Sequence, residues 1–246
     1  MRICIVQTKP IKGEIEQNLN VHLKFIKTAI EKNADIIIFP ELSLTGYEPE
    51  LARQLATTKN DERLNQFQNI SDVQNIIICV GLPTKVKNDI FISMIIFQPN
   101  KERISYSKQY LYPTEEGIFT AEHNPLIINF DKNNIIAPAI CYELSNPEHS
   151  KTAHKNNANI YIASVLNSVD GIDNDIKKLS EIAKRYKMTT FMSNYVGQSG
   201  GYECAGRSSV WNKNGDLIAQ LDNKNEGLLV FDTESEEIIK KNINCH

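Results

Sequence analysis

Three segments of the chain each place one chemically reactive residue where an apolar, strand-like run ends. Cys141 follows the run 135–140, Glu41 follows the run 34–39, and Lys108 stands at the end of a third strand pattern. A thiol, a carboxylate and an ammonium group are together the parts of a site that forms an acyl thioester. Because α/β sheets gather their sites at strand ends, we expect these three side chains to meet.

The chemistry that such a set could perform is attack of a thiolate on an amide carbonyl. Lys108 would favour the thiolate of Cys141, and Glu41 would take its proton as general base. The ammonium of Lys108 and the backbone N–H of Tyr142 would stabilise the oxyanion. Glu41 would then protonate the leaving nitrogen and activate the water that hydrolyses the thioester.

A second carboxylate follows the lysine. Glu116, eight residues after Lys108, is a candidate to keep the lysine charged and to orient the substrate. Aromatic and apolar residues near the three segments are candidates for the substrate pocket: Tyr47, Tyr112, Tyr142 and Val165.

The other cysteines are interpreted as small buried hydrophobes. Cys4, Cys79, Cys204 and Cys245 are scattered, and their spacing resembles neither a zinc site nor a disulfide framework. We therefore expect no metal site and a reducing, cytoplasmic environment.

Length and composition indicate an ordinary globular protein. The 246 residues are 41% hydrophobic and 23% charged, which suits one domain spanning residues 1–246. A net charge of −3 gives no electrostatic reason to expect a nucleic acid or an anionic membrane as partner. No apolar run approaches the roughly 18 residues that a membrane span needs.

Hydrophobic periodicity predicts strands and helices mixed along the whole chain. Strands are expected at 2–7, 34–39, 75–83, 90–98, 102–110, 126–130, 134–141, 159–166, 189–196 and 228–232, with a hairpin over 208–221. Helices are expected at 14–33, 147–157 and 173–187, and one or two helices are expected over 50–67. This pattern predicts an α/β fold, and so many strands favour two packed mixed sheets with helices outside.

The reactive residues and their neighbours resemble the motifs of the nitrilase, or carbon–nitrogen hydrolase, superfamily. The matching segments are 39–47, 106–108 with Glu116, 140–144, 194–197 and 206–208. The resemblance covers residues 2 to about 232. It implies a four-layer α-β-β-α sandwich, a Glu-Lys-Cys triad, no metal or organic cofactor, and assembly into homodimers or larger homo-oligomers. The implied reaction is hydrolysis of a non-peptide C–N bond in a small amide.

Two departures from the family bear on the substrate. Ser145 and Asn146 stand where many members carry an arginine and an aromatic residue, and basic residues there grip the carboxylate of carbamoyl amino acids. The segment 166–172 also lacks the aromatic and histidine pattern common after this strand. The resemblance therefore leaves the amide unidentified.

Other functions stay open on the residues alone. Cys141 could pair with His149 or His154 as in thiol proteases, although we expect both histidines on the solvated side of the helix 147–157. The chain could instead be a non-catalytic binding or assembly protein on a hydrolase scaffold. Within the enzyme class, the substrate could be a carbamoyl compound or a nitrile, and the acyl acceptor could differ from water.

Overall fold

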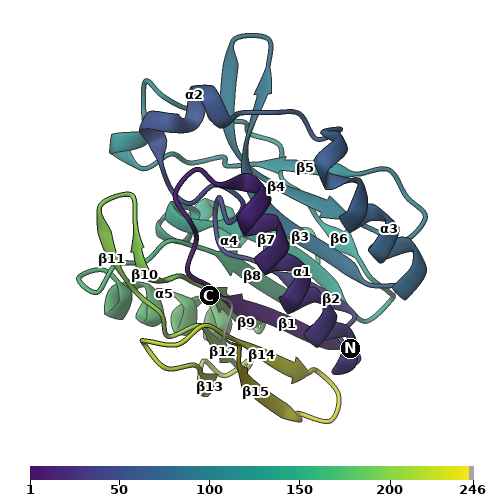
Figure 1. Ribbon diagram of the computed structural model, residues 1–246. Coiled ribbons are helices and arrows are strands. Elements are labelled where there is room, and N and C mark those ends of the chain that lie inside the picture. Colours follow the sequence, from purple (N-terminus) through teal and green to yellow (C-terminus); the bar gives the residue numbers. More distant parts are fainter. Residues whose placement is uncertain (244–246) are drawn as a thin grey trace.

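The computed structural model describes residues 1–243 and contains two main β-sheets (Figure 1). The larger sheet has the strand order β15 (Ile238–Asn242), β14 (Gly227–Asp232), β1 (Arg2–Gln7), β2 (Ile36–Ile38), β3 (Ile77–Val86), β4 (Asp89–Phe97) and β5 (Ile104–Ser107). Strands β1, β2 and β3 are parallel, and the strands on both sides of them are antiparallel. This sheet is therefore mixed, as the sequence predicted.

The smaller sheet repeats that plan. Its strand order is β13 (Leu217–Gln220), β12 (Ser209–Trp211), β9 (Thr189–Ser193), β8 (Ile160–Ser164), β7 (Ile135–Ile140) and β6 (Ile128–Asn129). Strands β7, β8 and β9 are parallel, between antiparallel edges. A separate hairpin joins β10 (Val196–Ser199) to β11 (Tyr202–Ala205).

Alternation along the strands divides the apolar side chains between two faces. On β1, Ile3 and Ile5 enter the core between the sheets, whereas Cys4 and Val6 face α1 (Ile15–Glu31). A strand covered on both faces must be apolar throughout, which is why these strands read as continuous hydrophobic runs.

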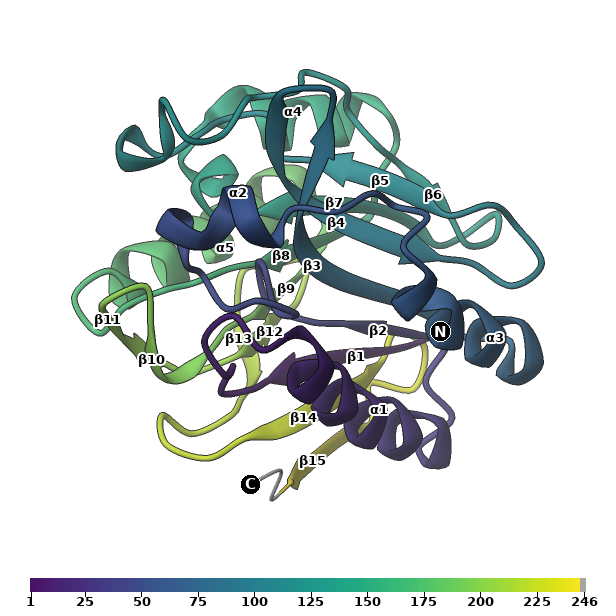
Figure 2. The same ribbon diagram turned by 45° about the horizontal axis from the view of Figure 1, so that its top comes forward.

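Helices cover the outer face of each sheet. Helices α1 and α3 (Asn65–Gln74) pack on the larger sheet, and α4 (Pro147–Lys155) and α5 (Ile172–Tyr186) pack on the smaller one (Figures 1 and 2). The predicted four-layer α-β-β-α sandwich is confirmed. Short helical segments complete the fold: η1 (Pro49–Leu51), α2 (Ala52–Leu55), η2 (Glu62–Leu64), η3 (Pro113–Glu115) and η4 (Cys141–Ser145).

Buried hydroxyl groups join the two sheets at the carboxyl ends of their parallel strands. Ser193 Oγ, on β9, donates to the carbonyl oxygen of Val6 at 2.6 Å, and Ser164 Oγ, on β8, donates to that of Phe39 at 2.8 Å. These bonds satisfy carbonyl groups that would otherwise be buried without partners. They also fix the chain two residues before Glu41.

Three elements differ from the sequence expectation. The stretch 50–67, predicted as one or two helices, contains the turns η1 and η2 and the one-turn helix α2, and the regular helix α3 spans residues 65–74, where Asn and Gln dilute the apolar period. The hairpin β10–β11 and the strand β15 were missed. Strand β15 is a mostly exposed edge strand with two lysines, and of its residues only Ile239 packs partly against the core, so the strand shows no apolar alternation.

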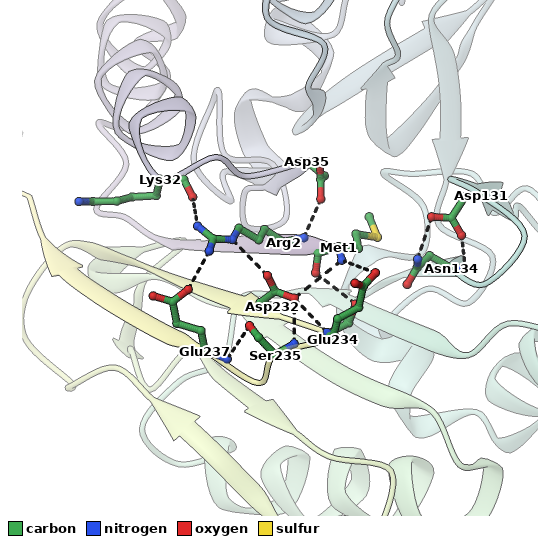
Figure 3. Close-up of polar contacts among 11 residues, drawn as sticks. Met1, Arg2, Lys32, Asp35, Asp131, Asn134, Asp232, Glu234, Ser235 and Glu237 are labelled. Carbon is green, nitrogen blue, oxygen red and sulfur yellow. Dashed lines mark hydrogen bonds and ion pairs between the residues drawn. The ribbon is translucent and has the colours of Figure 1, made fainter.

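Arg2 fastens the amino end of β1 to its surroundings (Figure 3). Its guanidinium donates to Asp232 Oδ2 at 3.2 Å and to Glu237 Oε2 at 2.7 Å, and to the carbonyl oxygen of Lys32 at 3.1 Å. We call Arg2, Asp232 and Glu237 the Arg2 cluster. It joins β1 to β14 and to the turn before β15, at the end of β1 opposite to Gln7.

Candidate active site

A buried lysine bridges two carboxylates at the carboxyl edge of the sheets. Lys108 Nζ donates to Glu41 Oε1 and to Glu115 Oε1, both at 2.8 Å. The side chains of Lys108 and Glu41 are 0% exposed, and that of Glu115 is 1% exposed. We call these three residues the catalytic cluster. Glu41 and Glu115 line the same cavity as Cys141.

A tight turn after β2 sets the position of Glu41. Leu42, the next residue, has a φ of 54°, which non-glycine residues seldom adopt. Gly81 of β3 passes under this turn so closely that a Cβ there would lie 2.3 Å from Leu42 N. Tyr195 Oη donates to the carbonyl oxygen of Glu41 at 2.5 Å. These contacts hold the turn, and with it the carboxylate of Glu41, in place.

Cys141 stands at a strained turn between β7 and η4. Its φ of 43° lies in the left-handed region, a conformation that costs energy and gathers at functional sites. In the described part of the chain, Cys141 is the one cysteine that is partly exposed; Cys4, Cys79 and Cys204 are buried as predicted. Cys245 lies outside the described residues.

Glu143 ties the lysine segment to the cysteine segment. Its Oε1 accepts the N–H of Gln109, and its Oε2 accepts the N–H of Ile140, both at 2.6 Å. These donors flank Lys108 and Cys141 in the chain. The carboxylate is fully buried, so its hydrogen bonds are not exchanged for water. Sequence reasoning missed Glu143, although its position three residues after a buried strand and two after Cys141 is a signal for such a role.

The prediction that Glu116 holds Lys108 is wrong by one residue. Glu116 is exposed, whereas Glu115 accepts hydrogen bonds from Lys108 Nζ, from Tyr47 Oη at 2.9 Å and from Tyr112 N at 2.7 Å. The helical turn η3 directs Glu115 inward and its neighbour outward. No periodic pattern in this loop could have distinguished the two carboxylates.

Neither His149 nor His154 forms a dyad with Cys141 in the structure. His149 is buried, against expectation, and its Nε2 and Nδ1 lie 2.8 Å from Tyr106 Oη and Tyr161 Oη. His154 is exposed, as expected, and packs beside Tyr186. His149 belongs to the hydrogen-bond network behind Glu143, whose Oε2 accepts from Tyr106 Oη at 2.8 Å.

Burial and mutual charge shift the pKa values of the three reactive groups. Burial raises the pKa of Glu41 to about 7; the Lys108 ammonium opposes this rise, and the Glu115 carboxylate adds to it. Burial disfavours the charged form of Lys108, but the surrounding groups Glu41, Cys141 and Glu115 together outweigh this effect and keep the lysine pKa above its usual value. Burial and the Glu41 charge raise the pKa of Cys141, so the resting thiol needs a base.

A cavity of about 330 Å³ opens in front of Cys141. Tyr47, Tyr112 and Tyr142 line it, in agreement with the prediction. The prediction for Val165 is wrong, because Val165 packs fully buried against the core under α5, and Leu166 lines the cavity instead.

Polar residues, of which the sequence singled out only Ser145, form a wall of the cavity that we call the outer wall. They are Ser145, Asn167, Ser168, Asn174, Asp175 and Lys178. The last three lie on α5, where the helical pattern shows which residues are apolar but not what the polar side faces.

Tyr142 N lies in the first turn of η4, where a helix offers its N–H groups no internal acceptor. This placement fits a donor to an oxyanion formed beside Cys141. Across residues 1–243, no three His, Cys, Asp or Glu side chains are grouped to hold a metal ion. None of the helices described there is long and apolar enough to span a bilayer.

Known proteins resemble this chain along almost its whole length. The model of the carbon-nitrogen hydrolase family matches residues 2–241. A "Hydrolase in agr operon" of Staphylococcus aureus is 22% identical over 97% of this chain and 93% of its own. A "Glutamine-dependent NAD(+) synthetase" of Acinetobacter baylyi is 24% identical over 96% of this chain, which spans 44% of that protein.

The fold also matches solved structures. An amidase from Nesterenkonia sp. AN1, in a complex with butyramide, superimposes with a TM-score of 0.87 at 23% identity, covering 96% of this chain and 92% of the other. The family model spans nearly the whole chain, including Glu41, Lys108 and Cys141. The chain therefore belongs to the carbon–nitrogen hydrolase family.

Proposed function

We propose that this protein is an amidase that hydrolyses a small amide through a thioester on Cys141. The observation that carries the proposal is the buried Lys108 between Glu41 and Glu115, two carboxylates that line one cavity together with the partly exposed thiol of Cys141. Burying three charged groups is costly, and a structural ion pair could be replaced by apolar packing. A catalytic role explains why this cost is tolerated, because the cavity exposes Cys141 beside the cluster.

The first half-reaction would transfer the acyl group to sulfur. Glu41 takes the thiol proton as the Cys141 sulfur bonds to the carbonyl carbon, and the C=O π electrons move to oxygen. Lys108 and the backbone N–H of Tyr142 stabilise that oxyanion. When it collapses, the C–N bond breaks, the nitrogen takes the proton from Glu41, and ammonia or an amine leaves.

The second half-reaction would regenerate the enzyme. Glu41 deprotonates a water molecule, whose oxygen attacks the thioester carbon, and the C–S bond breaks as the thiol recovers its proton. The sum is amide plus water giving carboxylic acid plus ammonia or amine. Glu41 Oε2 is buried and without a hydrogen-bond partner among the described residues, so it is free to handle these protons.

The solved structures that resemble this chain support an amide as substrate. The solved neighbours include a complex of the Nesterenkonia amidase with butyramide and covalent adducts at its active-site cysteine. A carbamoyl compound or a nitrile would use the same nucleophile, and transfer to an acceptor other than water would use the same thioester. A non-catalytic scaffold would not require Glu41, Lys108 and Cys141 together.

The test is ammonia release from a panel of small amides, ω-amides, carbamoyl compounds and nitriles. Wild-type protein should release ammonia from at least one amide, and Cys141→Ala should abolish that release. Partitioning of the product to a hydroxamate in hydroxylamine would reveal the acyl-enzyme. Equal release by wild type and Cys141→Ala would refute the mechanism.

Homodimer formation stays a prediction, and light scattering of the purified protein measures it.

A further inference from the structure

An ion pair stands in the outer wall of the cavity, separate from the catalytic cluster. Lys178 Nζ donates to Asp175 Oδ1 at 2.9 Å and to Ser145 Oγ at 2.7 Å. Asp175 and Lys178 lie three residues apart on α5, so both project from the same side of the helix. All three residues line the cavity that contains Glu41 and Cys141.

Both charged groups keep capacity for a further partner. An ammonium group has three N–H donors, and Lys178 uses two of them in its hydrogen bonds to Ser145 and Asp175. Asp175 uses one carboxylate oxygen for the lysine, and its other oxygen has no partner recorded among the described residues. The side chain of Lys178 is 28% exposed and that of Asp175 is 15% exposed, so water screens these charges less than ordinary surface charges.

The pair lies within electrostatic reach of the nucleophile. The Asp175 carboxylate is among the charges that raise the pKa of Cys141, after burial and the carboxylates of the catalytic cluster. The cavity is at the small end of the range for ligand sites, so a molecule of amino-acid size would reach both ends.

We propose that Asp175 and Lys178 bind the zwitterionic end of the substrate, and that the substrate is an ω-amide of an α-amino acid. This inference rests on the proposed amidase function. The α-ammonium group would bind Asp175, the α-carboxylate would bind Lys178, and the side-chain amide would reach Cys141.

Charge balance favours a zwitterion over a substrate with one charge. The pair is neutral as it stands, and an added carboxylate or ammonium group alone would leave one net charge in a partly shielded cavity. A zwitterion adds no net charge and gives each new group an opposite partner. Ser145 and Asn146 are not basic, but Lys178 on α5 places an ammonium group within hydrogen-bond distance of Ser145.

Four amides that share a butanamide unit separate these possibilities. Glutamine carries both charges, 4-carbamoylbutanoate carries only the carboxylate, 4-aminobutanamide carries only the ammonium group, and butyramide carries neither. Their binding is measured by calorimetry on Cys141→Ala, which leaves the cavity wall intact. Ammonia release is measured on the wild-type protein.

We expect glutamine to bind at least about 10-fold more tightly than each of the other three amides. Asp175→Asn should remove the preference for amides with the ammonium group, and Lys178→Met the preference for those with the carboxylate. Asp173→Asn and Lys177→Gln, exposed neighbours on α5 outside the cavity lining, are the matched controls and should leave the ratios unchanged.

A structural role alone would give a different result. The exchanged pair Asp175→Lys with Lys178→Asp keeps the ion pair, so a structural role predicts unchanged binding ratios, whereas recognition predicts that the glutamine preference falls about 10-fold or more. Equal binding of glutamine and butyramide to Cys141→Ala would overturn the inference. Absence of ammonia release from every amide by the wild-type protein would instead overturn the proposed function.

Discussion

The catalytic cluster and the Arg2 cluster are built from the same ingredients, a cation between two carboxylates, yet they differ in solvent. Lys108, Glu41 and Glu115 are at most 1% exposed. Arg2, Asp232 and Glu237 are 27%, 17% and 52% exposed (Figure 3). The catalytic cluster lies beyond the carboxyl end of β2, and the Arg2 cluster lies at the amino end of β1.

Solvent changes what these charges do. Backbone N–H groups, that of Glu234 first, lower the pKa of Asp232, as expected for a hydrogen-bonded surface carboxylate. Burial raises the pKa of Glu41 to about 7, where one carboxylate can both take and give a proton at neutral pH. The comparison teaches that burial, more than pairing, turns an ion cluster into an acid–base device.

The largest expected effect is that of removing the buried cation. Lys108→Met leaves Glu41 and Glu115 buried without their partner, which should cost about 3–5 kcal/mol in the free energy of unfolding. Activity should fall by about 10³-fold or more, since an oxyanion donor is also lost. Urea denaturation and steady-state kinetics measure the two effects. Near-normal activity in Lys108→Met would contradict the role of the cluster.

The next effect is that of loosening the tie between the two catalytic segments. Glu143→Gln puts an amide NH₂ where one carboxylate oxygen now accepts an N–H, from Gln109 or from Ile140. We expect kcat to fall by about 10- to 100-fold with little change in KM, because positioning is lost and binding is not. The control is Glu148→Gln, an exposed carboxylate on α4. A rise in KM with kcat unchanged would contradict a positioning role.

A smaller effect is a shift of the pH profile. The Glu115 charge raises the pKa of Glu41, so Glu115→Gln should lower it. Glu41 must be deprotonated to act as a base, so the acid limb of kcat/KM should move to lower pH, by about one unit. Glu116→Gln, the exposed neighbour, should leave the limb in place. A shift in the Glu116 variant and none in the Glu115 variant would reverse the assignment of the two residues.

The smallest effect is expected at the exposed cluster. Arg2→Met should lower the free energy of unfolding by about 1 kcal/mol or less, because partly exposed ion pairs contribute little. The loss should shrink as salt is added, and activity should stay unchanged. A loss as large as that of Lys108→Met would erase the distinction between the clusters.

The sequence sufficed for the layers of the fold and for three of the reactive residues. Buried strands are apolar throughout, and Glu41, Lys108 and Cys141 each mark the end of such a run. Strand β15 could not be predicted, since this mostly exposed edge strand shows no apolar alternation.

The rest of the site depends on loop phase and packing. Glu115 and Glu116 are adjacent, and only the turn η3 decides which one points inward. Val165 and Leu166, just after β8, are also adjacent, and only the local backbone decides that Val165 enters the core and Leu166 lines the cavity. Asp175 and Lys178 are ordinary polar residues of an amphipathic helix until α5 is seen to border the cavity.

The most direct test of the central claim is the rate at which iodoacetamide alkylates each cysteine of the native protein, followed by peptide mass spectrometry. The account predicts stoichiometric labelling of Cys141 ahead of Cys4, Cys79 and Cys204, at a rate that rises with pH through about 7 and falls in Glu41→Gln. Labelling of Cys141 no faster than of the buried cysteines, or at a rate independent of Glu41, would contradict it.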